Sequence, residues 1–245
     1  MHLEIGPPDE RVPAIIDLPI GDTPLPAVLL VHGLGSTKEQ MTGSIGRALV
    51  RRGIATLAVD LPMHGSRYVG GDVRSLMNPI AVAQQWRLAI REASHALRFL
   101  ASHADIDGSQ IAIAGYSLGA YVALVAAANN PSIRAVCLAA GGDLPSDIPF
   151  GPLIRNIVDP RRIIRNIAGR PLLMVNGRFD QRIRPEAAEA LFAAALEPKE
   201  LRWYEGGHWP PPNVIDDAAD WLSLQLGAHL AVASHKSRTR APKRA

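Results

Sequence analysis

The sequence predicts an α/β fold: a mostly parallel, doubly wound sheet with helices on both faces. Apolar runs typical of strands buried on both faces alternate with segments of helical periodicity along the chain. Several of these runs end in short polar turns that contain glycine. No internal repeat or linker divides the 245 residues, of which 47% are hydrophobic. We therefore expect a single domain over residues 1–230 and a basic, disordered tail over 231–245.

The expected elements follow in chain order. Short strands over 2–6 and 11–18, separated by Gly-Pro-Pro, can pair as a hairpin at a sheet edge, where proline is tolerated. The helix over 80–101 carries apolar residues at three- and four-residue steps, and residues 66–79 before it form a loop. Further strands are expected over 27–31, 54–59, 111–114, 133–140, 171–175 and 201–204, and further helices over 41–52, 120–126, 185–196 and 214–226.

The net charge of +3 does not indicate a nucleic-acid-binding protein. Five basic residues lie in the last ten positions, and removing them leaves a remainder of −2. The basicity therefore belongs to the tail, and no aromatic residues there could stack on bases. We expect no nucleic-acid partner.

The sequence contains few features that indicate a cellular compartment or a membrane. No stretch of eighteen apolar residues indicates a membrane span, and no signal peptide is visible at the amino terminus. The single cysteine, Cys137, lies in an apolar run and is expected to fill the core. These features favour a reducing, cytoplasmic setting. The sequence carries no signal for an oligomeric state.

The stretch Gly115-Tyr116-Ser117-Leu118-Gly119 stands between an expected strand and an expected helix of small residues. In that setting the spacing is typical of a nucleophile elbow, a strained turn that lifts the serine hydroxyl clear of the sheet. The two glycines remove side chains that would collide with neighbouring backbone. The alternative is a turn in which Ser117 caps the following helix.

A nucleophilic serine needs a base and a carboxylate that orients the base. Of eight histidines, His208 follows the last strand in Glu-Gly-Gly-His-Trp, so we predict it as the base. Asp180 comes directly after the strand over 171–175 and is the predicted acid, with Asp143 as its rival. The order serine, acid, histidine is the one expected when the serine comes first.

Acyl transfer also needs donors aimed at the developing oxyanion. The backbone N–H of Leu118 follows from the elbow. The second donor is expected in His32-Gly33-Leu34-Gly35, where we choose the N–H of Leu34 and leave Gly33 and Gly35 open.

These motifs together resemble the α/β-hydrolases over about residues 26–226. The carriers are Ser117 in Gly-Tyr-Ser-Leu-Gly, Asp180 in Gly-Arg-Phe-Asp, His208 in Gly-Gly-His, and the early His-Gly-Leu-Gly. Asp60-Leu61-Pro62-Met63-His64-Gly65 also matches a turn of this superfamily. The chain is most similar to the small serine esterases of the dienelactone-hydrolase-like and prolyl-oligopeptidase-like branch. It departs from dienelactone hydrolases in using serine rather than cysteine, and no propeller domain precedes the catalytic region.

The resemblance implies hydrolysis of carboxylic esters through an acyl-serine, a chemistry that needs no cofactor. The histidines and acids lack the close spacing of a metal site, and the short cap described next predicts short-chain esters. The segment from Gly141 to Arg170 is a short cap, with apolar residues over 150–158 that form either a small flap over Ser117 or a surface loop. Peptidase, amidase or thioesterase activity would use the same triad, and a non-catalytic binding protein is the alternative from another class. Candidate apolar walls of the substrate pocket are Met41, Met63, Tyr116, Phe150, Trp209 and Pro211.

Overall fold

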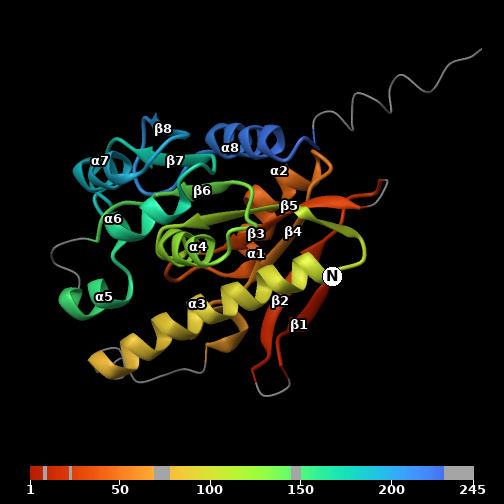
Figure 1. Ribbon diagram of the computed structural model, residues 1–245, viewed down its shortest axis with the longest axis horizontal. Coiled ribbons are helices and arrows are strands. Elements are labelled where there is room, and N and C mark those ends of the chain that lie inside the picture. Colours follow the sequence, from red (N-terminus) through yellow and green to blue (C-terminus); the bar gives the residue numbers. More distant parts are fainter. Residues whose placement is uncertain (8–9, 22–23, 69–77, 145–149, 229–245) are drawn as a thin grey trace, which may run out of the picture.

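The computed structural model describes residues 1–7, 10–21, 24–68, 78–144 and 150–228. Its core is an eight-stranded sheet in the order β1-β2-β4-β3-β5-β6-β7-β8 (Figure 1). The strands are β1 (His2–Ile5), β2 (Val12–Asp17), β3 (Leu25–Val31), β4 (Ala55–Val59), β5 (Ile106–Tyr116), β6 (Val136–Ala139), β7 (Leu172–Gly177) and β8 (Lys199–Tyr204). The pairs β1–β2 and β2–β4 are antiparallel, and all others are parallel. The expected hairpin therefore lies at one edge of the predicted mostly parallel sheet.

Helices cover both faces of the sheet (Figure 1). One core cluster joins the sheet to α3 (Pro79–Ser102), α4 (Leu118–Asn129) and α7 (Pro185–Ala194), and a second joins it to α2 (Arg47–Val50) and α8 (Pro212–Gln225). Six of the seven residues of β3 are buried, and Pro26 is the exception, as expected of a strand covered on both sides. This arrangement confirms the predicted fold class.

Helix α3 begins one residue earlier than predicted. The side chain of Asn78 accepts hydrogen bonds from the N–H groups of Ile80 and Ala81, and Pro79 occupies the first turn. Helix α4 is buried on all sides from Gly119 to Ala127, which its uniformly apolar sequence explains.

The helix predicted over 41–52 is wrong in detail. It begins at Lys38 and has three parts: α1 (Lys38–Met41), the π-helical segment η1 (Thr42–Gly46), and α2. Glycines at 43 and 46 weaken the α-helical preference there, and a Cβ on Gly46 would lie 3.2 Å from the Leu30 side chain. Gly46 thus allows this segment to pack closely against Leu30 of β3.

Other boundaries also differ from the prediction. Strand β5 begins at Ile106, five residues early, because Leu25 of β3 pairs with it there. The strand expected over 133–140 is shorter, since only Val136–Ala139 pairs with β7. The 3₁₀ turn η2 (Gly65–Arg67) begins the region expected to be a loop, and residues 69–77 lie outside the described part of the chain. The predicted tail over 231–245 also lies outside it.

The segment between β6 and β7 holds α5 (Gly151–Ile157), α6 (Pro160–Ile163) and the 3₁₀ turn η4 (Ile164–Ile167). Ile154 and Val158 are buried in the same core cluster as Ile164 and Ile167. Much of the apolar surface offered as a flap is therefore core packing, while residues 145–149 lie outside the described part. None of the described helices has the length and apolar character needed to cross a bilayer.

Candidate active site

Ser117 lies at a sharp turn between β5 and α4. Its backbone has φ 52° and ψ −116°, a conformation that costs a non-glycine residue about 1–3 kcal/mol. The Ser117 N–H donates to the carbonyl of Ala139 at 2.9 Å, which ties the turn to β6. The side chain makes no capping bond to α4, so the helix-cap alternative does not describe this serine.

The two glycines of the pentapeptide allow this turn to pack tightly. A Cβ on Gly115 would collide with the Gly119 carbonyl, and one on Gly119 would collide with the carbonyls of Val31 and His32. Backbone of β3, β5 and α4 therefore meets here without intervening side chains. This is the physical reason that the spacing requires glycine at both positions.

His208 lies in the loop after β8 and faces Ser117. Its Nε2 is 2.9 Å from Ser117 Oγ, and its Nδ1 is 2.7 Å from Asp180 Oδ2. These partners fit the tautomer in which Nδ1–H donates to the carboxylate and Nε2 accepts the serine proton. The histidine side chain is 8% exposed, so bulk water reaches it little.

Two tyrosines hold the histidine loop. The Tyr204 hydroxyl donates to the carbonyl of Gly207 at 2.8 Å, and the Tyr116 hydroxyl donates to that of His208 at 3.3 Å. Burial raises the pKa of Tyr204 to about 12 and also raises the pKa of Tyr116. Both hydroxyls therefore keep their protons at neutral pH and remain donors.

Asp180 is buried, and both of its carboxylate oxygens have hydrogen-bond partners. Its Oδ1 accepts from the N–H groups of Arg182 at 2.8 Å and Ile183 at 3.0 Å, which leaves Oδ2 directed at His208. The acid loop and the histidine loop are joined by a bond from the Phe179 N–H to the Gly206 carbonyl at 2.9 Å. These backbone bonds fix the carboxylate before any substrate arrives.

The rival acid, Asp143, has other partners. Its Oδ1 accepts from Arg155 at 2.9 Å and from the Leu144 N–H at 2.9 Å. Among the described residues, no hydrogen bond joins Asp143 to His208. The geometry therefore favours Asp180.

The turn after β3 lies against the elbow. A Cβ on Gly33 would be 2.8 Å from the Tyr116 ring and 3.1 Å from Ser117 Cβ, so only glycine fits. Within the described chain, no acceptor is bonded to the N–H of Leu34 or of Leu118. The N–H groups of Gly33 and Gly35 likewise have no acceptor within the described chain, so the choice of Leu34 for the oxyanion stays a prediction.

Behind this turn lies a polar cluster that sequence reasoning missed. His32 is buried: its Nδ1 donates to the Gly33 carbonyl at 2.8 Å, and its Nε2 accepts from the Leu61 N–H at 3.0 Å. Burial lowers the pKa of His32 to about 4, so the ring is neutral. It joins the turn after β3 to the turn after β4.

Asp60 and Lys38 form a buried ion pair in this cluster. Lys38 Nζ lies 2.6 Å from Asp60 Oδ2, and the carboxylate also accepts from the backbone N–H groups of Lys38 and Ser66. Burial alone would raise the pKa of Asp60, but these hydrogen bonds hold it below its usual value. The Asp60 turn and the His-Gly-Leu-Gly turn with His32 both carried a sequence signal, through their resemblance to superfamily motifs; nothing local marks Lys38 as buried.

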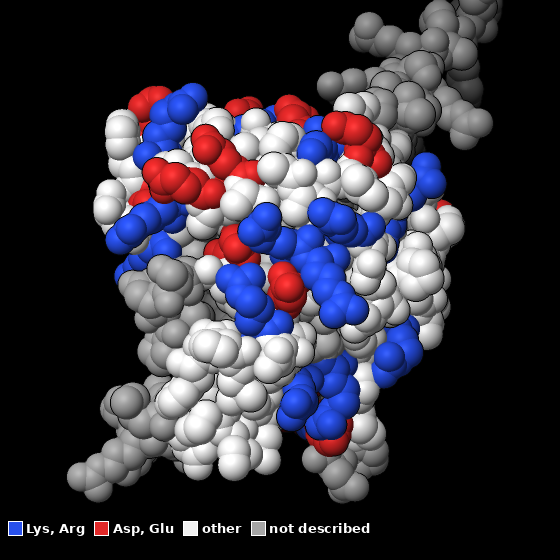
Figure 2. Space-filling model, turned by 60° about the vertical axis from the view of Figure 1, so that its left-hand side comes forward, with Lys and Arg blue, Asp and Glu red and all other residues white. Residues whose placement is uncertain are grey.

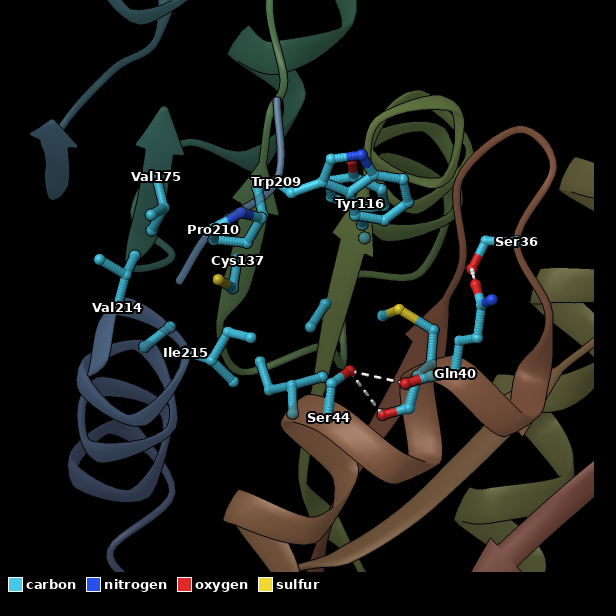
Figure 3. Close-up of a pocket in the computed structure, with 16 residues that line it drawn as sticks. Ser36, Gln40, Ser44, Tyr116, Cys137, Val175, Trp209, Pro210, Val214 and Ile215 are labelled. Carbon is cyan, nitrogen blue, oxygen red and sulfur yellow. Dashed lines mark hydrogen bonds between the residues drawn. The ribbon is translucent and has the colours of Figure 1, made fainter. Parts of the chain in front are cut away.

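The predicted pocket walls are only partly brought together. An apolar cavity beside the site is lined by Met41, Tyr116 and Trp209 among others, whereas Met63, Phe150 and Pro211 do not line it (Figure 3). Phe150 instead begins α5, and Met63 lies in the turn after β4. Pro210 takes the position expected for Pro211.

The charge on the molecule is not confined to the tail. Eight arginines lie between residues 155 and 184, and Figure 2 shows basic side chains gathered, with acidic ones among them, on the side that Figure 1 places around α5 to α7. The net positive charge still comes from the tail, because the rest of the chain sums to −2, but basic side chains also gather on this side of the molecule. Across the described chain, no group of three or more histidine, cysteine, aspartate or glutamate side chains could hold a metal ion.

Comparisons with known proteins agree with this architecture. The model of the Alpha/beta hydrolase family matches residues 28–241. The chain is 27% identical to Esterase YjfP of Escherichia coli strain K12, over 88% of this chain and 96% of that protein.

Solved structures show the same fold. A cold-adapted esterase from an Arctic intertidal metagenomic library superposes with a TM-score of 0.71 at 23% identity, over 92% of each chain. Est1E from Butyrivibrio proteoclasticus, solved with ferulic acid bound, superposes with a TM-score of 0.73 at 16% identity, over 92% of this chain and 99% of that one. With most of its length matched by the family model, this chain belongs to the alpha/beta hydrolase family and is a hydrolase enzyme.

Proposed function

We propose that this protein is a serine esterase that hydrolyses short-chain carboxylic esters. The observation that carries the proposal is the hydrogen-bonded series from Ser117 Oγ through His208 to Asp180, with distances of 2.9 and 2.7 Å. Nucleophile, base and orienting acid lie within the reach that acyl transfer requires. The similarity to Esterase YjfP supports the same reaction class.

Acylation begins when Ser117 Oγ attacks the ester carbonyl carbon while His208 Nε2 takes the hydroxyl proton. The carbonyl oxygen becomes an oxyanion that accepts hydrogen bonds from the N–H groups of Leu34 and Leu118. When the tetrahedral intermediate collapses, the bond to the alcohol oxygen breaks and His208 gives that oxygen the proton. The products of this half are the free alcohol and an acyl-Ser117.

Deacylation repeats the same steps with water. His208 takes a proton from the water as it attacks the acyl carbon, and returns that proton to Ser117 Oγ as the acid leaves. Asp180 keeps His208 in the required tautomer and stabilises its cationic form without taking the proton. Because its Oδ1 is held by two backbone N–H groups, Oδ2 stays aligned with Nδ1 throughout.

The preference for short chains rests on the small cap. The described part of the segment between β6 and β7 directs Ile154 and Val158 into the core, which leaves few apolar residues to cover a long acyl chain. Amide and thioester hydrolysis would use the same residues. A binding protein without activity is less favoured, because such a protein would not need the strained serine and its aligned base.

A series of nitrophenyl esters of increasing acyl length, run beside a thioester and an anilide, tests this function. We expect the highest kcat/KM on a short ester and loss of that activity in Ser117→Ala. Preference for the anilide would replace the esterase assignment with a peptidase. Activity that survives in Ser117→Ala would remove Ser117 from the mechanism.

Ester hydrolysis by this triad requires no partner beyond the small-molecule substrate. We also propose a reducing, cytoplasmic location, on the strength of one buried cysteine with a free thiol. A fluorescent fusion expressed in the native cell would test that location.

A further inference from the structure

An apolar cavity of about 270 Å³ lies between the α1–η1 segment and α8 (Figure 3). Its floor is formed by small side chains at the carboxyl ends of β5 and β6, and Ile215 and Ala218 of α8 form one wall. Tyr116 and Trp209 lie together across its upper side in Figure 3. The floor residues are Ala114, Cys137 and Ala139.

The lining suits hydrocarbon rather than charged groups. The Ser44 hydroxyl donates to the Gln40 carbonyl at 2.7 Å, and the Ser36 hydroxyl donates to Gln40 Oε1 at 2.6 Å. These polar groups already have partners inside the protein. Burial raises the pKa of the Cys137 thiol to about 12, so the floor is uncharged at neutral pH. An ion entering this space would lose its hydration without compensation.

Two residues that line the cavity are chain neighbours of the predicted triad residues. Tyr116 directly precedes Ser117, and Trp209 directly follows His208. The two aromatic rings have centroids 4.9 Å apart, and the His208 ring centroid lies 5.3 Å from that of Tyr116. Ser117, Asp180 and His208 do not line the cavity themselves. The space is therefore a side pocket next to the reacting centre.

The cavity is a recess that is partly open to solvent. It exists because alanines stand at positions 114, 139 and 218, where larger apolar residues would fill it. The π-helical segment η1 contributes Ser44 and Ile45 to its lining, and π-helical turns occur often at functional sites. Small residues and an altered helical winding together keep the space open.

We infer that this cavity is the apolar subsite of the substrate, which receives the hydrocarbon or aromatic group on one side of the ester bond. The inference rests on the proposed esterase function. A cavity of about 150 Å³ accommodates benzene, so 270 Å³ accommodates roughly a phenyl ring with a short side chain. The subsite thus sets an upper limit on substrate size, with Ala218 and Ile215 as the residues that determine it.

Two substitutions on α8 test the subsite, with one matched control. Ala218→Leu fills the cavity, Ile215→Ala enlarges it, and Ala193→Leu makes the same change as the first on the exposed side of α7. Each is assayed on nitrophenyl esters of increasing acyl length and on acetate esters of increasingly large alcohols. A change in one series and not the other assigns the acyl or the alcohol group to the cavity.

We expect Ala218→Leu to lower kcat/KM about tenfold or more on the largest ester that the parent enzyme hydrolyses well. One or two methylenes in an apolar pocket have effects of that size. The smallest ester should change less than about twofold. Ile215→Ala should shift the optimum toward larger groups, and Ala193→Leu should match the parent enzyme. Thermal unfolding confirms that each variant is folded.

A uniform loss across both series in Ala218→Leu, with an unmoved optimum in Ile215→Ala, would overturn the inference. The inference would also be overturned if Ala193→Leu changed the substrate profile in the same way as Ala218→Leu. Labelling with a fluorophosphonate separates this failure from that of the proposed function. If Ser117 is labelled and the profiles do not move, the subsite alone is rejected; if Ser117 is not labelled, the esterase function is rejected first and the subsite with it.

Discussion

Two aspartate–histidine pairs lie at the carboxyl edge of the sheet, and only one is arranged for catalysis. Asp60 follows β4, with His32 Nε2 3.9 Å from its Oδ1. Asp180 follows β7, with His208 Nδ1 2.7 Å from its Oδ2. Both carboxylates are buried, so burial and residue type do not distinguish them.

The two pairs differ in the hydrogen-bond partners of their histidines. Both ring nitrogens of His32 are bonded to backbone groups, and the pKa of His32 is lowered to about 4 by burial. His208 has one nitrogen on a carboxylate and the other on the Ser117 hydroxyl. A histidine that acts as a base needs an acceptor nitrogen that faces a transferable proton, and in His32 that nitrogen is occupied by the Leu61 N–H.

The two carboxylates also differ in their hydrogen-bond partners. Asp60 is neutralised by Lys38 and by hydrogen bonds from Ser66, so it anchors two loops. Asp180 has two backbone N–H groups on one oxygen and keeps the other for His208. One pair therefore holds two loops together, and the other has the geometry that the proposed reaction requires. Substitutions in each pair should have effects of different kinds.

The largest effect is expected from Asp180→Asn, which preserves shape but cannot hold the tautomer that His208 needs. We expect kcat to fall about 10⁴-fold, equivalent to about 5 kcal/mol of transition-state stabilisation. Steady-state kinetics on a short nitrophenyl ester measure it. A loss of less than tenfold in a folded variant would make the two pairs equivalent and remove Asp180 from the triad.

Lys38→Met should mainly affect stability. It leaves the buried carboxylate of Asp60 without its cation, which costs about 3–5 kcal/mol. Urea unfolding measures the change. The control is the double variant Lys38→Met with Asp60→Leu, which removes both charges and should recover much of the stability. Equal stability of the single variant and the parent would show that Lys38 is not needed there.

The His32 pair should also make stability depend on pH. Because the folded pKa is lowered from 6.5 to about 4, the unfolded chain binds a proton in this window that the folded chain does not. The free energy of unfolding should therefore decrease by about 3 kcal/mol as pH falls from 6.5 to 4. The lowered pKa of Asp60 adds to this decrease only at the acid end of the window, where the carboxylate of the unfolded chain begins to take up protons.

Chemical unfolding at several pH values, compared with His32→Gln, measures this term. The variant cannot take up the proton, so its stability should vary less over the same window. An identical pH dependence in parent and variant would assign the effect to other groups.

The smallest effect is expected from Asp143→Asn. Its carboxylate pairs with Arg155, whose side chain is 40% exposed, and such pairs contribute less than about 1 kcal/mol. Activity should stay within about threefold of the parent enzyme. A loss comparable with that of Asp180→Asn would restore Asp143 as the acid.

The sequence was informative where a function requires particular residues in a local pattern. Glycines at 115 and 119 mark the elbow because backbone contacts exclude any side chain there. The apolar runs predicted the fold class, since a strand buried on both faces must be apolar throughout. The predicted triad residues lie within hydrogen-bonding distance of one another.

The sequence was uninformative where contacts between distant segments decide the structure. Lys38 is buried in the fold, where Asp60, 22 residues later in the chain, lies beside it and accepts its hydrogen bond. The cavity depends on small residues from β5, β6 and α8, which no local pattern relates. Met63 and Phe150, which were predicted as walls of the substrate pocket, do not line this cavity.

The central claim is that Ser117 is a nucleophile activated by His208. Mass spectrometry after incubation with a fluorophosphonate tests it most directly, on the parent chain, Ser117→Ala and His208→Ala. We predict a single adduct on Ser117 in the parent, none in Ser117→Ala, and labelling slowed by several orders of magnitude in His208→Ala. An adduct on another residue, or labelling of Ser117 at the parent rate without His208, would contradict the account.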